Sequence, residues 1–492
     1  MIEYRKNSSK ILVNKLKPYY FKELAEYDEV DVLEKLENNQ IVLEKLSSHP
    51  NVNFKNGKYK FQYVGIIVID DVVINCYPKY IPNENNIEND FKEIINVIKK
   101  YDKSKYKFGY ENLEFADNSF NRLSLMLFFM EDYFENGLYT NYQSILEING
   151  NGEIDWSRTI NDTVAIIQNN NPYYTDLLTK HNMADTFDYF RLLHEYIITD
   201  CSEFFEKHDL LDLFDLTPVK LSDKSLENFG EKEFILNKIY KQLNIEFNTH
   251  KRKLLKFMYN YFVEKSVFSD DEFLSEYGVS KYEHIWEEMC AFVFDNRLDD
   301  KVGKTLSDLF DEEYSSNIKF KDIVKRPVWI LNGDSFEEDK FRLDLLTFDK
   351  NENGVDFIIM DAKYYILNFK DGQLKGQPGL ESITKQYLYQ LAFKEFIDKI
   401  KKFNCIKNAF LLPKYGYNQI RNEGYVTLKI LNDLGLEDIQ VMMIPANKLN
   451  KLYLSESLSD MFEFKLELLA KLKEKNKSKK DFIDNHTNKI GF

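Results

Sequence analysis

The chain has 492 residues, of which 43% are apolar and 30% charged, so it holds material for about two to four packed domains. Its net charge of −15 opposes binding of a polyanion over the whole surface, and any nucleic-acid contact must rest on a local basic patch. Four cysteines stand far apart without the spacing of a zinc knuckle, and no apolar run approaches the roughly 20 residues of a membrane span. These features predict a cytoplasmic protein with no membrane association.

Residues 1–150 combine β and helical patterns and are predicted to form an amino-terminal mixed domain. The apolar run 58–69 indicates a strand, Asp70 and Asp71 a turn, and 72–77 the second strand of a hairpin. Amphipathic helices are expected from there to Leu138.

Residues 151–271 are predicted to form a helical middle domain. From about residue 172 to residue 265, the apolar side chains recur at helical spacing, and this stripe is expected to be core.

Residues 272–450 change pattern and predict a third domain that mixes helices and strands. The expected order is a helix, three strands, a second helix and two further apolar runs, at 282–296, 327–331, 342–348, 355–361, 381–401, 409–413 and 439–445. Residues 451–492 are expected to form a helix that ends in a lysine-rich tail. The whole chain is therefore predicted to be a multidomain α/β (α+β) protein.

Two carboxylates interrupt neighbouring apolar strands of this third region. Asp344 stands between leucines, and Asp361 ends the run Ile-Ile-Met, where an unpaired charge would cost several kcal/mol. If the strands form a hairpin, both carboxylates reach one divalent cation, and oxygen ligands suit Mg²⁺ or Mn²⁺. Lys363 lies two residues beyond Asp361, hence on the same face, where it can orient or deprotonate a water or offset phosphate charge. This set fits phosphodiester hydrolysis.

A simpler interpretation of Asp361 and Lys363 is an ion pair at a strand edge. Their apolar setting, the hairpin spacing and the helix that follows favour the catalytic interpretation. Residues 363–423 also carry eleven Lys and Arg against five Asp and Glu, a local excess that fits contact with DNA phosphates.

The arrangement resembles the PD-(D/E)xK nuclease core, with Asp344 and Asp361 as its acids and Lys363 as its lysine; Leu343 stands where that core often has proline. The resemblance implies a further metal-binding acid from the preceding helix. Glu287 is favoured over Glu283 for this role, and an ordinary charged helix face is the alternative. It also implies that Gln386, on the downstream helix, positions Lys363 or the phosphate, unless this glutamine is simply part of a polar helix surface.

Further segments, at 63–67, 77–79, 152–160, 282–288 and 361–364, extend the likeness to McrC-type restriction subunits. The pattern is most similar to the LlaJI restriction endonuclease family. That resemblance implies a Mg²⁺-dependent subunit that cleaves double-stranded DNA in an antiviral restriction-modification system. It further implies a McrB-like AAA+ GTPase, docked by residues 1–150, and a DNA methyltransferase as partners.

Two other functions remain open at this point. The chain could mainly regulate or scaffold a partner GTPase, with nuclease activity secondary or lost, although the intact acids and lysine argue against loss. It could also be an RNA or repair nuclease, because one catalytic fold serves many substrates.

Overall fold

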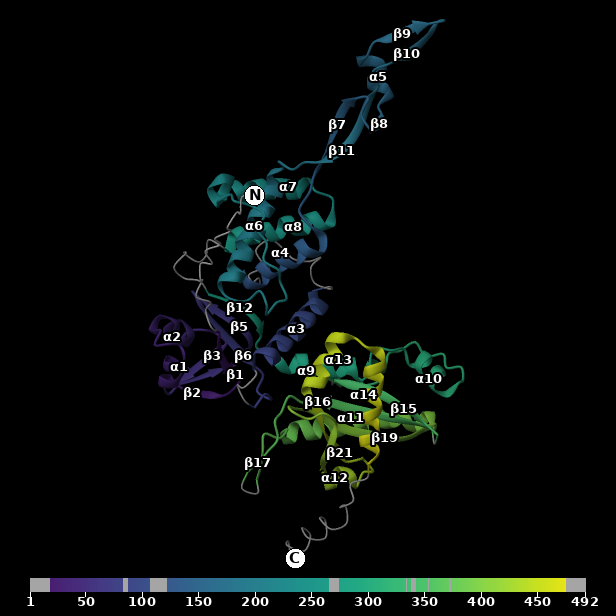
Figure 1. Cartoon of the computed structure of the whole chain (residues 1–492). Helices are drawn as coiled ribbons and strands as arrows, with labels where there is room; N and C mark the ends of the chain where they lie inside the picture. The colour runs from purple at the N-terminus through teal and green to yellow at the C-terminus, as the bar shows by residue number, and fades with distance from the viewer. Residues whose placement is uncertain are drawn as a thin grey trace, which may run out of the picture. The chain divides into compact units, whose positions relative to one another are not determined.

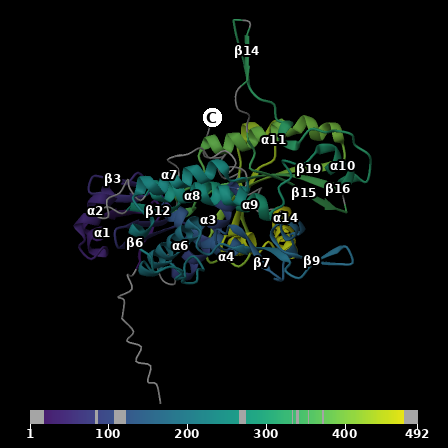
Figure 2. The same ribbon diagram turned by 90° about the horizontal axis from the view of Figure 1, so that it is seen from above.

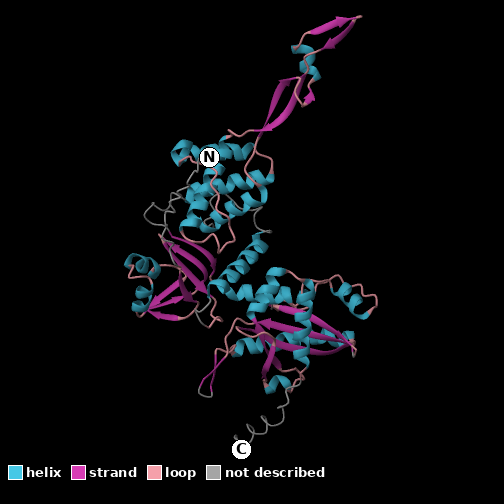
Figure 3. Cartoon of the chain, in the orientation of Figure 1, coloured by secondary structure: helices cyan, strands magenta, loops and turns pink. Residues whose placement is uncertain are grey.

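The computed structural model describes residues 18–82, 87–106, 122–264, 274–332, 334–337, 342–352, 354–370 and 373–474. Its contacts divide the chain into two units that are discontinuous in sequence. The first unit holds Met1–Pro18, Ile67–Ile74 and Glu111–Tyr277, and the second holds Tyr19–Ile66, Asn75–Tyr110 and Gly278–Phe492. This division into two units does not test the four contiguous domains expected from the sequence, which stay a prediction. Figure 3 shows helices and strands mixed within both units, as the α/β assignment expects.

Four helices form the packed part of the first unit: α4 (Arg122–Asn136), α6 (Tyr189–Lys207), α7 (Lys232–Ile245) and α8 (Thr249–Glu264). Helix α4 contacts α6 and α8, and α7 contacts α8. Apolar side chains on their facing sides are buried, among them Phe129, Leu193, Ile197 and Met258. The helical spacing predicted for this region therefore marks its core, as expected. A short 3₁₀ helix, η2 (Leu226–Phe229), lies between α6 and α7.

A β-rich extension, residues 142–184, is inserted between α4 and α6 and is called the β arm here. Figure 1 shows it reaching beyond the helices of its own unit. One antiparallel sheet has the order β7-β11-β8, and β9 pairs with β10 beyond it. The bounds are β7 (Tyr142–Ile148), β8 (Glu153–Ile154), α5 (Trp156–Asp162), β9 (Ala165–Gln168), β10 (Asn171–Tyr174) and β11 (Leu178–Ala184).

The helix expected from about residue 172 is wrong as far as residue 184, where β10 and the whole of β11 lie. Most side chains of the β arm are exposed or half-exposed. Strands are recognised in a sequence by one buried face, so a ribbon that lies outside a core leaves no such pattern.

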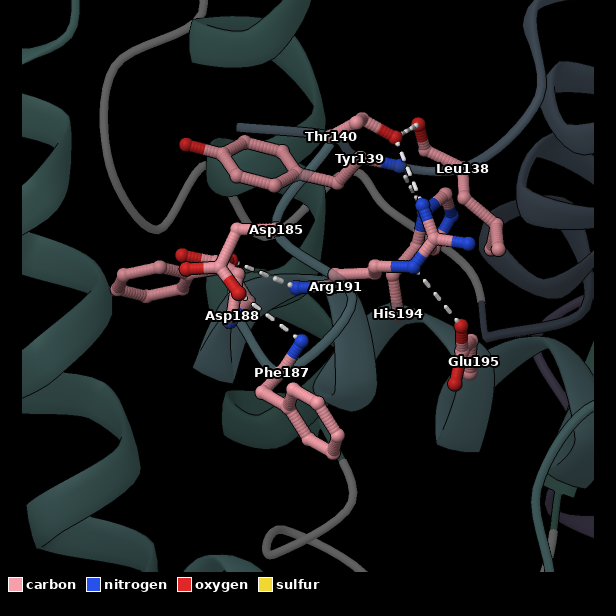
Figure 4. A network of polar contacts seen from close by, with 10 residues as sticks. Leu138, Tyr139, Thr140, Asp185, Phe187, Asp188, Arg191, His194 and Glu195 are labelled. Atoms are coloured by element: carbon pink, nitrogen blue, oxygen red, sulfur yellow. Dashed lines mark hydrogen bonds and ion pairs between the residues drawn. The ribbon is translucent and has the colours of Figure 1, made fainter. Parts of the chain in front are cut away.

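Polar contacts hold the root of the β arm to the start of α6 (Figure 4). Asp188 caps the helix by accepting the backbone N–H of Phe190 and of Arg191. The guanidinium of Arg191 donates to Thr140 Oγ1 at 3.1 Å and pairs with Glu195 at 3.2 Å. The two ends of the arm are therefore tied to one helix terminus.

His194, within the same network, is fully buried, and its Nδ1 accepts the N–H of Tyr139 at 3.1 Å. Burial, helped by the nearby His250, lowers the pKa of His194 to about 3 from 6.5. The unfolded chain therefore takes up a proton between pH 6.5 and 3 that the folded chain refuses. Stability is full above pH 6.5 and falls as the pH drops through this window, by about 1.4 kcal/mol per pH unit.

We expect His194→Gln to lose less stability between pH 7 and pH 5 than the wild type, as measured by thermal unfolding at both pH values. His181→Gln, which replaces a part-exposed histidine of the β arm, serves as the control and should keep the wild-type dependence. Equal pH dependence in all three proteins would contradict the neutral state assigned to His194.

The amino-terminal part of the second unit packs short strands against two helices. Its antiparallel sheet has the order β2-β4-β3, and its core includes stacked Phe21 and Phe61, with ring centroids 4.5 Å apart. A four-stranded sheet has the order β1-β6-β5-β12. Each of the strands β5, β6 and β12 has residues in both units. The bounds are β1 (Tyr19–Lys22), β2 (Glu26–Asp28), α1 (Glu29–Lys35), α2 (Gln40–Ser47), β3 (Val52–Lys55), β4 (Lys58–Phe61), β5 (Val64–Ile69), β6 (Val72–Tyr77), α3 (Ile87–Tyr106) and β12 (Leu274–Val279). The predicted hairpin is confirmed as β5, a turn at Asp70 and Asp71, and β6. The single strand predicted over 58–69 is wrong, because β4 and β5 are separate strands that belong to different sheets.

The rest of the second unit is built on a five-stranded sheet of order β15-β16-β19-β21-β20. Strand β16 pairs antiparallel with β15 and parallel with β19, which pairs parallel with β21. The last strand, β20, is antiparallel to β21. The bounds are β15 (Leu345–Asn351), β16 (Gly354–Ala362), β19 (Phe403–Lys414), β20 (Arg421–Val426) and β21 (Ile439–Pro445). Eight of the nine residues of β16 are buried, which explains its nearly continuous apolar sequence.

Helices cover both faces of this sheet, and Figure 2 shows α11 and α14 on opposite sides of its strands. Side chains of α11 enter the core that β15 and β16 form, together with residues of α10 and η3. Helix α9 contacts β16, and α13 contacts β21. The bounds are α9 (Tyr282–Val293), α10 (Val302–Phe310), η3 (Phe320–Asp322), α11 (Leu380–Ile400), α12 (Lys429–Asn432), α13 (Ala446–Ser455) and α14 (Leu458–Lys473). Two small ribbons complete the unit, β13 (Val328–Leu331) with β14 (Asp334–Glu337), and β17 (Asn368–Lys370) with β18 (Gln373–Lys375).

The seven elements predicted for residues 272–450 occur in the predicted order, but β12, α10, η3, β14, β17, β18, β20 and α12 were not predicted from sequence. The strand predicted at 327–331 forms as β13, which is exposed and pairs with β14 instead of joining the five-stranded sheet. Of the predicted lysine-rich tail, residues 475–492 lie outside the described part of the chain. Among the helices that the structure describes, none combines the length and the hydropathy of a membrane span.

Candidate active site

The β15–β16 hairpin brings the two predicted acids together. Its register pairs Leu345 with Met360, so the next residues outward on the two strands are Asp344 and Asp361. The backbone N–H of Ala362 donates to Asp344 Oδ2 at 3.1 Å, which closes the open end of the ladder. Asp361 also lies two residues beyond Ile359, whose side chain packs in the core under α11, so both project from that face.

Lys363 joins this pair directly. Its Nζ lies 3.0 Å from Asp361 Oδ2, and the two side chains are only 18% and 4% exposed. Its backbone N–H donates to the carbonyl of Leu411 at 2.9 Å, which fixes the chain to β19 just after β16 ends. Asp344, Asp361 and Lys363 therefore lie at one edge of the sheet, as the sequence predicts.

Burial and the neighbouring Asp361 disfavour the charged form of Asp344. Burial raises the pKa of Asp344 to about 9, and the hydrogen bond and charge of Asp361 add to it, followed by the charge of Glu287. Burial opposes the charged form of Lys363, but the negative charges of Asp361, Asp344 and Glu287 outweigh it and raise the lysine pKa. Lys363 is therefore an ammonium at neutral pH, and one proton is held on Asp344 beside Asp361.

Helix α9 carries the two glutamates considered for the third acid. Trp286, fully buried, anchors this helix by donating Nε1–H to the Leu411 carbonyl at 3.1 Å. Glu287, whose side chain is 35% exposed, lies near enough to raise the pKa of Asp344. The charge of Glu283 acts instead on Lys79 and on Glu23, in a different cluster of the unit. The geometry therefore favours Glu287, as the sequence analysis does.

Gln386 is fully buried on α11, which excludes its interpretation as surface polarity. Its Nε2 donates to Asn408 Oδ1 at 2.6 Å, and its Oε1 has no hydrogen-bond partner among the described residues. Asn408 pairs in register with Ile359, two residues before Asp361. The described contacts include none between Gln386 and Lys363, so any effect on the lysine passes through β19.

A cavity of about 1000 Å³ opens beside the acids and is lined by both Glu287 and Asp344. Three cationic side chains share its lining, namely Lys321, Arg326 and Arg342. The lining also holds Glu288, Asp299 and Asp322, and neither Asp361 nor Lys363 is among its residues. Carboxylates therefore outnumber cations in this cavity, and a phosphate anion would need a bound cation beside it to enter.

Sequence reasoning did not single out Arg342 and Tyr389. The Tyr389 hydroxyl donates to the Arg342 carbonyl, and the charges of Asp344 and Asp361 help raise the pKa of this buried tyrosine. The spacing of both residues from predicted site residues could have indicated them. Arg342 stands two residues before Asp344, and Tyr389 follows Gln386 by three residues on one helix face.

The structure provides two carboxylates, Asp344 and Asp361, that could hold a metal ion together, but does not bring Glu287 to them. Among the described residues, no donor forms a well-aligned hydrogen bond to Asp361 Oδ2, although Lys363 Nζ lies near it. Asp344 holds a proton that it would give up to bind a cation. Oxygen donors of this kind suit Mg²⁺. Within the described residues, however, no group of three His, Cys, Asp or Glu side chains is close enough to hold a metal ion, so Glu287 does not lie within ligand distance of the pair.

Comparisons with known proteins place the chain in a family. The model of the LlaJI restriction endonuclease family matches residues 63–452. A similar curated protein is the type II restriction enzyme BsuMI component YdjA of Bacillus subtilis (strain 168), 26% identical over 439 residues, which are 86% of either chain.

Two solved structures show a more distant likeness. One is Thermococcus gammatolerans McrC bound to McrB AAA+ hexamers (TM-score 0.36, 11% identity, 92% of this chain and all of that chain). The other is the McrBC complex of the same organism (TM-score 0.24, 15% identity, 56% of this chain and 86% of that chain). Neither is close enough to bear on the site. The family model, in contrast, spans most of the chain and includes Asp344, Asp361 and Lys363, and so the chain belongs to the LlaJI restriction endonuclease family.

Proposed function

We propose that the chain is the DNA-cleaving subunit of a restriction system and hydrolyses phosphodiester bonds in double-stranded DNA with Mg²⁺. The observation that carries this proposal is the convergence of Asp344, Asp361 and Lys363 at one sheet edge, in a member of a restriction endonuclease family. We further propose that the five-stranded sheet and its flanking helices are a PD-(D/E)xK nuclease core.

In this proposal Asp344 and Asp361 hold the metal, and Glu287 completes the set when DNA and metal enter the cavity. The chemistry that a bound Mg²⁺ supplies in such a site is stabilisation of charge on the phosphoryl group and activation of a water. Lys363, which carries its proton at neutral pH, stabilises negative charge on the phosphate rather than acting as the base. Gln386, acting through Asn408, holds β19 against α11 and so keeps the edge in place.

Cleavage is expected to need a divalent cation and to stop when the cation is chelated. Asp344 would have to lose its proton before both carboxylates could hold a cation, and this proton leaves more readily as the pH rises towards 9. The Mg²⁺ concentration for half-maximal cleavage should therefore fall with rising pH, by up to about tenfold per unit between pH 6 and 8.

This expectation is measured with purified chain, alone and with the products of neighbouring genes, on plasmid DNA over a Mg²⁺ series at each pH. Mn²⁺ should replace Mg²⁺. Undiminished cleavage in excess chelator would disprove the metal-dependent mechanism, and a constant Mg²⁺ requirement would disprove the proton competition.

A second candidate function, regulation of a partner, is favoured by the surface of the β arm. Large apolar side chains stand exposed along it, with Trp156 at 54%, Ile167 at 66% and Val164 at 83%. Exposed apolar surface of this extent marks a protein-binding site. We propose that the arm contacts an AAA+ GTPase of the same system, in addition to the docking role proposed for residues 1–150, with a DNA methyltransferase protecting host sites.

The two functions are separated by measuring GTP turnover and DNA cutting in the same mixtures of chain and AAA+ partner. The double variant Ile167→Ser/Val164→Ser should lower stimulated GTP turnover while leaving the nuclease site intact. If the stimulated GTP turnover is unchanged in this variant, the arm does not contact the partner.

A further inference from the structure

A second cavity of the same unit, about 510 Å³ in volume, is lined by three lysines from separate parts of the chain. Lys22 ends β1, Lys79 follows β6, and Lys414 ends β19. Among the described lining residues, Glu23 is the one carboxylate. The cavity is thus cationic in a chain whose net charge is −15. We call it the lysine pocket.

The carboxylate of Glu23 is already engaged by the protein. It is 5% exposed, and its Oε2 accepts both the hydroxyl of Tyr364 at 2.6 Å and the backbone N–H of Lys79 at 3.1 Å. The ammonium of Lys79 lies over the Tyr364 ring, 4.1 Å from its centroid. Glu23, which lines the pocket, and Tyr364, which is bonded to it, therefore hold Lys79 in place.

The other two lysines lack a carboxylate partner. Lys22 and Lys414 are half-buried, and neither forms an ion pair with any residue that the structure describes. The nearest described aromatic contact of Lys414 is the Tyr417 ring, with a centroid 5.6 Å away. Burial lowers the pKa of Lys22, because a half-buried ammonium loses part of its hydration. An anion bound in the pocket would restore the lost interaction.

The pocket lies close to the candidate active site along the chain. Ile366, in its lining, follows Lys363 by three residues, and Lys414 follows Leu411 by three, where the Leu411 carbonyl binds the Lys363 N–H. Three extended residues span about 10 Å. Two short stretches of chain therefore connect the pocket to the candidate active site.

We propose that the lysine pocket is a phosphate-binding subsite in which Lys22, Lys79 and Lys414 hold a phosphate of the DNA backbone other than the one at the bond that is cut. This inference rests on the proposed function for the identity of the polyanion. The subsite sets where the strand lies on the enzyme and carries no base recognition, because phosphate contacts fix register rather than sequence.

The test is DNA binding by the full chain, measured by fluorescence anisotropy without divalent cations so that no cleavage occurs. The double variant Lys22→Gln/Lys414→Gln removes two pocket charges and spares Lys79, which packs on Tyr364. Lys58→Gln/Lys350→Gln is the matched control, since it removes two exposed lysines of the same unit that lie outside both the pocket and the basic stretch 363–423.

The pocket variant should bind duplex DNA more weakly, and the slope of log affinity against log salt should shrink by about 0.9 for each phosphate that the variant no longer neutralises. The control should keep the wild-type slope. Duplexes in which one phosphate is replaced by a neutral methylphosphonate, scanned along a strand, should weaken binding by the wild type at one or two positions, and the pocket variant should be insensitive to these replacements. Inorganic phosphate and a nucleoside triphosphate, added as competitors, identify whether free phosphates share the subsite.

Equal salt slopes for the pocket variant and the wild type, or a wild type that does not bind DNA, would overturn the inference. If the pocket substitutions weaken binding of the triphosphate but leave the affinity for DNA unchanged, DNA is not the ligand of the pocket. A pocket-dependent slope in a protein that fails to cut DNA with Mg²⁺ would leave the subsite standing and remove the nuclease function, so the two proposals fail separately.

Discussion

Asp361→Asn is expected to lower DNA cleavage by more than about a hundredfold and to leave the fold intact. Asp361 is the most buried of the acids and lysine of the site, pairs with Lys363 at 3.0 Å and helps raise the pKa of Asp344, which burial raises most. Loss of even an outer partner of a metal ligand costs about 10- to 100-fold, and a ligand itself costs more. Asparagine keeps the shape and removes the charge, which eases ionisation of Asp344 but takes one negative partner from Lys363. The protein should therefore still unfold in one cooperative transition, with no gain in thermal stability without metal.

The measurement is single-turnover cleavage of plasmid DNA, paired with a thermal unfolding curve for each protein. Asp308→Asn, an acid of α10 outside the acid pair, provides the control and should cut at the wild-type rate. A variant at position 361 that cuts as fast as the wild type would show that the acid pair is structural, and the strand-edge ion pair would then be the correct interpretation.

Glu287→Gln is expected to reduce cleavage by about 10- to 100-fold, whereas Glu283→Gln one turn earlier should stay within about twofold of the wild type. The physical reason is the direction in which each carboxylate faces. Glu287 lines the cavity with Asp344, while Glu283 interacts with Lys79 and Glu23. Each variant is the natural control for the other, because both remove one charge from the same helix.

The decisive readout is the Mg²⁺ dependence of the cleavage rate for both variants. If Glu287 completes the metal site, its replacement raises the Mg²⁺ requirement, which the Glu283 variant does not. The reverse order of effects would assign the third acid to Glu283 and would require α9 to turn on its axis.

The two strands that carry the acids, β15 and β16, could be predicted because they are buried on both faces. Residues 355–361 form a run too apolar for any surface element, and the turn that precedes it carries asparagine and glycine. A hairpin at that point aligns Asp344 with Asp361 by geometry alone, and the period of a strand puts Lys363 on the same face. The core of the site is therefore local in sequence, within about 20 residues.

Residues whose partners are distant in sequence could not be predicted in the same way. The burial of Gln386 depends on Asn408, and the orientation of Glu287 depends on the hydrogen bond from Trp286 to Leu411. The contact between Glu23 and Tyr364 joins positions 341 residues apart. A sequence pattern carries no information on such contacts, since each arises only when separate elements pack together.

The amino-acid sequence by itself determined the family, the main elements around the candidate site and the acid pair with its lysine, because burial and strand period can be recognised from neighbouring residues. Only the tertiary structure decided the exposed β arm, the direction of each glutamate on α9 and the lysine pocket. In those places exposure, rotation and charge depend on what packs against a residue, and that partner comes from elsewhere in the chain.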